Sequence, residues 1–119
     1  MKSLSEFGFI RKGSFYKLNP LADIYKENKW TTNYLAANGS IERTFELTAG
    51  NLSTMTVMGE CKSGFLALLI CQEEITKEIN LTNKKEENID LKDLSPGLVK
   101  MIITAKAVKR MKTTIFWLD

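Results

Sequence analysis

The sequence contains no histidine, and it has only two cysteines and two prolines among its 119 residues. Without histidine the chain cannot form a Ser-His-Asp triad, a His-ligated zinc or haem site, or an imidazole acid–base pair. It also lacks a Gly-rich phosphate loop, a paired-cysteine motif and an acidic run with metal-ligand spacing. We therefore expect a protein that is not an enzyme and that binds no cofactor or metal.

Long hydrophobic runs are missing as well. The longest apolar run, Phe65 to Cys71, is far shorter than the ~18 residues of a membrane span. Near the N-terminus, Glu6, Arg11 and Lys12 interrupt the apolar run that a secretory signal requires. We expect no membrane span. As written, the sequence is that of a cytoplasmic protein, and a mature fragment of an exported protein would read the same way.

The residues that are present are typical of one compact domain, with 44% hydrophobic and 26% charged side chains. From Gly39 onward, apolar and polar residues alternate with the period of β-strands. We expect an all-β fold, an antiparallel β-sandwich of about seven strands. The expected strands cover residues 41–47, 52–61, 65–71, 75–81, 89–91, 99–107 and 113–118. An amphipathic helix over residues 98–112 is the alternative for the last third.

Residues 1–38 have no clear period, but they hold more than half of the aromatic side chains. Asn19-Pro20 predicts the start of a short helix. A segment so rich in aromatic residues is not typical of disorder, so we expect it to pack on one face of the sandwich. The chain is then a single domain, 1–119, with an N-terminal segment, 1–38, and a β-sandwich core, 39–119.

The two cysteines lie on either side of a short Gly-containing segment, Lys62-Ser63-Gly64, which predicts a hairpin loop. Such a hairpin places Cys61 opposite Phe65 and leaves Cys71 several residues away along the ladder. The two thiols are then too far apart for a disulfide, and we expect both to be free.

Positive charge is concentrated at the C-terminal end. Residues 96–119 contain five basic side chains and only Asp119 as an acid. Three of the five, Lys109, Arg110 and Lys112, fall in the expected loop between the strands 99–107 and 113–118. A basic loop attracts an acidic partner, although such charges also solvate loops and protect edge strands from aggregation. We take these three residues as candidate partner contacts.

The segment Phe65 to Cys71 is apolar on both of its faces. If Phe65, Ala67 and Leu69 line the core, then the second face needs a cover of its own. That second face consists of Leu66, Leu68 and Ile70. Either the aromatic N-terminal segment covers it, or another protein chain does, such as a protein partner or a second copy in a homodimer. We therefore take these three residues as candidate partner contacts too.

From Gly39 to Asp119 the chain resembles small bacterial immunoglobulin-like or jelly-roll β-sandwich domains. The resemblance is carried by Gly39-Ser40-Ile41 with Phe45-Glu46-Leu47, by Gly64 to Ile70, and by Ile89 to Gly97 before the strand Val99 to Ala107. It implies a β-sandwich that serves as a binding or spacer unit attached to Gram-positive surface proteins or enzymes. It assigns no functional residue.

Three functions remain open. The leading hypothesis is a non-enzymatic binding module that uses the apolar strand face and the basic loop, with Phe65, Trp30 or Trp117 as anchors. The second is a cytosolic nucleic-acid binder on a small β-barrel, which salt should weaken steeply. The third is a carboxylate-dependent hydrolase, for which Asp90 and Glu60 are the residues to test.

Overall fold

The computed structural model describes residues 10–16 and 23–118. It confirms an all-β, antiparallel fold with almost no helix. The strands are β1 (Ile10–Tyr16), β2 (Asp23–Lys26), β3 (Lys29–Leu47), β4 (Thr56–Glu60), β5 (Ser63–Gln72), β6 (Ile75–Asn80), β7 (Lys84–Asn88) and β8 (Gly97–Phe116), and a short helix α1 (Ala49–Ser53) follows β3.

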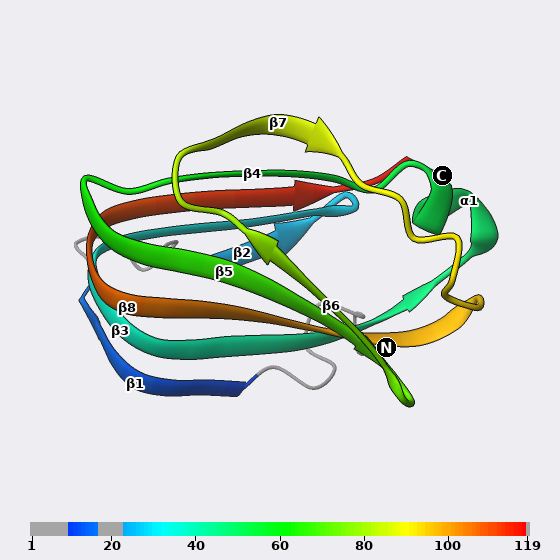
Figure 1. Ribbon diagram of the computed structural model, residues 1–119, viewed down its shortest axis with the longest axis horizontal. Coiled ribbons are helices and arrows are strands. Elements are labelled where there is room, and N and C mark those ends of the chain that lie inside the picture. Colours follow the sequence, from blue (N-terminus) through cyan, green and yellow to red (C-terminus); the bar gives the residue numbers. More distant parts are fainter. Residues whose placement is uncertain (1–9, 17–22, 119) are drawn as a thin grey trace.

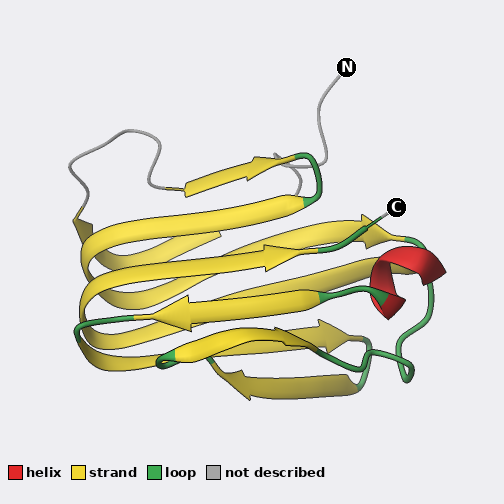
Figure 2. Cartoon of the chain, turned by 90° about the horizontal axis from the view of Figure 1, so that it is seen from above, coloured by secondary structure: helices red, strands yellow, loops and turns green. Residues whose placement is uncertain are grey.

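Two very long strands, β3 and β8, form the centre of the sheet and pair with each other from Lys29↔Phe116 to Leu47↔Gly97. The free side of β8 pairs first with β5 and then with β4, whose outer neighbours are β6 and β7. The free side of β3 pairs with β1 and β2. The result is a single eight-stranded sheet. Its two halves lie over each other as two layers because the long strands bend (Figures 1 and 2).

The core lies between these two halves. Phe45, near the end of β3, contacts Trp30 at the start of the same strand, with 5.7 Å between the ring centroids. It also contacts Trp117, at 5.1 Å. Because β3 bends, residues fifteen positions apart in one strand face each other across the core. Aromatic rings of this size bury a large apolar area, so this cluster contributes strongly to holding the two halves together.

The bend is the place where β1, β3, β5 and β8 cross from one half to the other. The ladder between β3 and β8 shifts register between Ala37 and Gly39, and the ladder between β5 and β8 shifts between Ser63 and Phe65. Gly39 and Gly64 have φ of 152° and 95°. A Cβ on Gly39 would lie 2.0 Å from the Lys12 carbonyl oxygen, so only glycine fits there. Bulges of this kind are how a sheet turns a corner.

The segment Lys62-Ser63-Gly64 is part of this bend, and the hairpin predicted for it is wrong. β4 and β5 do not pair with each other; they follow one another along β8, with Glu60↔Lys112 and Ser63↔Lys109. The Lys62 N–H donates to the Lys109 carbonyl oxygen at 2.8 Å. A glycine in a short polar segment suits a bulge as well as a turn, which is why the pattern misled. Both cysteines are nevertheless free.

The predicted loop at residues 109–112 is also wrong, because β8 runs without interruption from Gly97 to Phe116. The same strand excludes the alternative helix over residues 98–112. The strand expected over residues 52–61 begins only at Thr56, because residues 49–53 form α1, whose N-cap Thr48 and Asn51 form a capping box.

The N-terminal segment also differs from the prediction. Its residues 10–16 and 23–26 form strands β1 and β2, and residues 29–38 are the first half of β3. They belong to the sheet instead of covering one of its faces, and the division expected at 38/39 falls inside β3. The helix expected after Asn19-Pro20 lies outside the described residues.

Candidate functional site

The apolar strand β5 presents the opposite face from the one expected. Leu66, Leu68 and Ile70 are 0% exposed and lie in the core between the two halves of the sheet. Phe65 is 45% exposed on the other face of the strand. The other half of the sheet covers these three side chains, so a partner cannot reach them in this fold.

The proposed aromatic anchors divide in the same way. Trp30 and Trp117 are buried in the core cluster with Phe45. Phe65 stays at the surface, opposite Lys106 of β8. Of the three, only Phe65 is placed where it can contact another molecule.

The two carboxylates named for a hydrolase lie in different places. Glu60 lines a hollow of about 300 Å³ over β4 and β8. Asp90 lines a separate hollow of about 460 Å³ between β6 and β7. A glycosidase requires its two carboxylates about 5–10 Å apart at one cleft, and this pair does not share one. Within residues 10–16 and 23–118, no group of three or more Cys, Asp or Glu is placed to hold a metal ion.

The basic side chains, in contrast, gather at the bend. Lys109 and Arg110 were expected in a loop, but they sit in β8 where it turns the corner. Regular strands alternate buried and exposed residues, yet here two exposed residues follow each buried one, because Ala107 and Arg110 have φ of 49° and 53°. Lys109 and Arg110 therefore both point to solvent.

Strand pairing adds further cations to the same place. Lys106 lies opposite Phe65, Lys62 adjoins Lys109, and Lys12 lies one position from the Gly13–Gly39 pair. We call this surface the basic bend. Its members, all exposed, are Lys12, Lys62, Lys106, Lys109, Arg110 and Lys112. Among the described residues of the bend, the opposing charge is Glu60, which faces Lys112 across the β4–β8 ladder.

A shallow hollow of about 240 Å³ lies on the outer side of the bend. We call it the alanine hollow, because three of its lining residues are alanines. Asn38 also lines it, and the Asn38 Oδ1 accepts a hydrogen bond from the Ala107 N–H at 3.0 Å. The lining residues are Ser14 and Tyr16 of β1, Ala36, Ala37 and Asn38 of β3, and Ala107, Val108 and Lys109 of β8. Tyr16 is 67% exposed, which is unusual for so large a ring.

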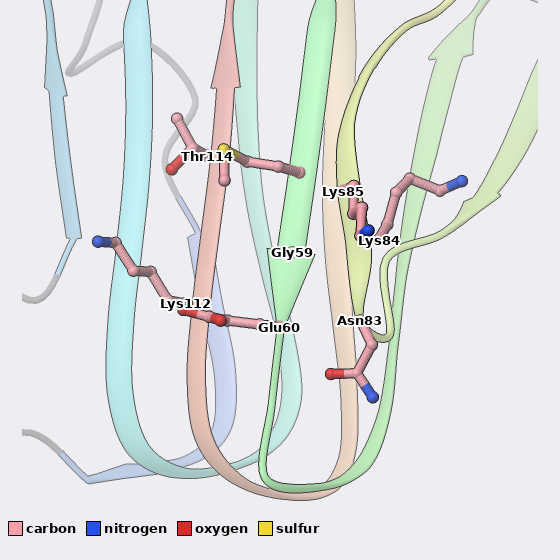
Figure 3. A pocket seen from close by; sticks show the side chains of 8 residues that line it. Gly59, Glu60, Asn83, Lys84, Lys85, Lys112 and Thr114 are labelled. Carbon is pink, nitrogen blue, oxygen red and sulfur yellow. The ribbon is translucent and has the colours of Figure 1, made fainter.

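A second hollow adjoins the basic bend at Lys112 (Figure 3). Its shape depends on Gly59, where a Cβ would lie 2.4 Å from the Leu81 carbonyl oxygen. This close approach brings the turn before β7 onto β4, and the side-chain oxygen of Asn83 accepts a hydrogen bond from the Cys61 N–H there. The hollow is lined by Met58, Gly59, Glu60, Asn83, Lys84, Lys85, Lys112 and Thr114.

Three lysines, Lys84, Lys85 and Lys112, and one carboxylate, Glu60, line this second hollow. The Lys84 amine lies 3.5 Å from Glu87 and extends away from Lys112 (Figure 3). Glu60 lies beside Lys112. Opposite charges that face each other across a strand pair stabilise the sheet modestly. Two of the three lysines, Lys84 and Lys112, therefore have a carboxylate nearby.

The cysteine nearest the bend, Cys61, is buried. Burial raises the pKa of the Cys61 thiol above its ordinary value. Its Sγ lies 3.8 Å from the Gly64 carbonyl oxygen, to which the protonated thiol donates. A thiol must lose its proton to react, so burial lowers the reactivity of this one.

Comparison with protein-family models, with curated proteins and with solved structures finds no match to this chain. Nor does any helix in the described part of the chain have the length and apolar character to cross a membrane.

Proposed function

We propose that the protein is a non-enzymatic binding module that contacts a negatively charged partner through the basic bend. The observation that carries this proposal is the grouping of six exposed cations from β1, β8 and the segment before β5, with Glu60 as the opposing carboxylate among the described residues.

Clustered charge of one sign raises the local concentration of an oppositely charged partner and speeds its association. At the bend, four of these side chains project from β8, a strand paired on both sides. The backbone beneath them is therefore fixed by β-ladders rather than carried on a loose loop. Less backbone entropy is lost on binding when the charges are already in place.

The burial of the apolar face of β5 limits which kind of interface the protein can form. With Leu66, Leu68 and Ile70 in the core, an interface made mainly of apolar strand surface has no support. Phe65 supplies an exposed aromatic side chain next to Lys106. The proposed contact is therefore electrostatic, with a single aromatic anchor.

The test measures retention on immobilised heparin, a general polyanion, for the wild type and two triple variants. In K106Q/K109Q/R110Q the basic bend loses three charges. In the control, K26Q/K29Q/K92Q, three exposed lysines at the opposite end are lost, so the net charge falls equally. We expect the first variant to elute at a much lower salt concentration and the control to elute close to the wild type.

Two outcomes would overturn the proposal. Equal shifts for both variants would show that only net charge matters. Absence of retention of the wild type at low salt would show that the basic bend does not bind polyanions at all. Circular dichroism of each variant checks that the fold is intact.

A further inference from the structure

The most exposed large aromatic ring of the described chain stands beside the alanine hollow. Tyr16 is 67% exposed, and Ala36, Ala37 and Ala107 line the hollow with it. Because alanine side chains are so short, the backbone of β3 and β8 comes close to the surface there. The hollow of about 240 Å³ is therefore shallow and mostly apolar, with an aromatic ring among its lining residues. This shape suits a flat ring laid against Tyr16.

The hollow is mostly apolar, but polar residues are among those that line it. Two of them are Ser14 and Asn38, and the Asn38 side chain is held in place by the hydrogen bond from Ala107 N–H. A ring with donors and acceptors on its edge can pair with a hydroxyl and an amide in these positions. Lys109 lines the same hollow, so a negative group attached to the ring has a cation within the site.

A second exposed aromatic ring lies on the same sheet, with lysines between it and Tyr16. Phe65 of β5 lies beyond β3 and β8 from Tyr16, about three strand spacings away, or roughly 14 Å across the strands. Lys106 and Lys109 of β8 lie between the two exposed rings. Aromatic rings separated by cations form the pattern by which proteins hold single-stranded nucleic acid, with bases stacked on the rings and phosphates on the lysines.

We infer that the basic bend binds single-stranded nucleic acid and that the alanine hollow holds one unpaired base against Tyr16. This inference rests on the proposed function, since it names the anionic partner of the same surface. An acidic protein has carboxylates but few flat rings to fill the hollow, and in a duplex the base faces are stacked inside. The shape and the charge together favour an unpaired strand.

The experiment measures binding of a short fluorescein-labelled oligothymidylate by fluorescence anisotropy at low ionic strength. Three variants are compared with the wild type: Tyr16→Ala, Tyr16→Phe and Ala36→Leu, the last of which fills the hollow. Loss of one stacked base should weaken binding by about 5- to 100-fold in Tyr16→Ala. Tyr16→Phe keeps the ring and should bind as the wild type does. Ala36→Leu should weaken binding as Tyr16→Ala does.

Heparin retention of the same variants separates this inference from the proposed function. We expect Tyr16→Ala to be retained as the wild type is, because heparin has no aromatic base to stack. If Tyr16→Ala and Ala36→Leu bind the oligonucleotide like the wild type, the base site is refuted while the proposed function stands. If a polyglutamate peptide competes as well as the oligonucleotide does, the partner is an acidic protein surface instead. If the wild type binds neither heparin nor oligonucleotide, both proposals fail.

Discussion

The two ends of the molecule are built in different ways, and only the bend has a clear excess of positive charge. At the bend, long strands pass without interruption from one half of the sheet to the other through bulges and positive-φ residues. At the opposite end, short turns, the helix α1 and the segment 89–97 reverse the chain (Figure 2). The opposite end has Glu27, Glu46, Glu73, Glu74, Asp90 and Asp93 against Lys26, Lys29, Lys77, Lys92 and Lys100.

The comparison shows how positive charge becomes concentrated at one end of a protein whose net charge is only +3. Four of the six cations of the basic bend come from one stretch, residues 106–112. Cations that are far apart in the chain meet because bent strands bring residues 12, 62 and 106–112 to one corner. Bulges then turn neighbouring residues of β8 outward together, which a regular strand does not allow. The folding of the sheet creates the charge cluster.

The largest expected effect on stability comes from a substitution in the core, which both ends share. Leu68→Lys places an amine among fully buried apolar side chains, and we expect it to abolish folding or to cost about 4 kcal/mol or more. Leu69→Lys, on the outer, half-buried face of the same strand, is the control and should cost far less. Far-ultraviolet circular dichroism and size-exclusion chromatography with light scattering read both. A wild-type dimer that Leu68→Lys converts into a folded monomer would contradict the inner placement of this residue.

Glycine replacements sharpen the contrast between the two ends. Gly64→Ala at the bend combines a φ of 95° with a Cβ only 2.4 Å from the Ala107 carbonyl oxygen, so we expect a loss of roughly 3 kcal/mol or more. Gly97→Ala at the opposite end has a φ of 137° and open space around its Cβ, so only backbone strain of about 1–2 kcal/mol is expected. Urea unfolding measures both. Equal losses would mean that the bend is not tightly packed.

The helix cap at the opposite end gives a smaller effect. The Thr48 hydroxyl accepts a hydrogen bond from the Asn51 N–H at 3.1 Å, and Thr48→Ala removes it. We expect a loss of about 1 kcal/mol in urea unfolding, whereas Thr48→Ser keeps the acceptor and most of the stability. Heparin retention should not change, because the basic bend is at the other end. A shift in retention with Thr48→Ala would show that the two ends are not independent.

The smallest effect concerns Cys61. Burial raises the pKa of its thiol, so the folded protein holds this proton more tightly than the unfolded chain does. Its contribution to stability is complete below the ordinary thiol pKa and is lost as the pH rises through the higher folded value. In a Cys71→Ser background, urea unfolding should therefore show a slightly larger loss of stability above pH ~9 than in the same protein with Cys61→Ser. Identical pH profiles of the two proteins would show that the Cys61 thiol does not affect the free energy of unfolding.

Much of the fold can be predicted from the sequence, because the alternation of apolar and polar residues indicates which side chains face inward. Ile41 to Leu47 and Val99 to Ala107 form strands where the pattern predicts them. Turns and bulges, however, use the same residues, so Gly64 does not reveal that the chain continues along β8. Alternation also cannot predict which face of β5 is buried, since both faces are apolar. The buried face is the one that the other half of the sheet covers.

Only part of the candidate site can be predicted from the sequence. Lys109, Arg110 and Lys112 stand out because they are close together in the sequence. Lys12, Lys62 and Tyr16 do not, since pairing of distant strands brings them to the same surface. No periodicity in a single sequence reports that contact. The pairing of β1 with β3 and of β5 with β8 is the information that the sequence pattern lacks.

The most direct test of the central claim is a map of backbone amide chemical shifts during titration with the oligothymidylate. We expect the largest changes at the bend, around Gly13 to Tyr16, Ala36 to Gly39 and Lys106 to Arg110, while the amides of α1 and the turn at Glu73 and Glu74 stay unchanged. Changes centred on the opposite end, or spread evenly over the molecule, would contradict it.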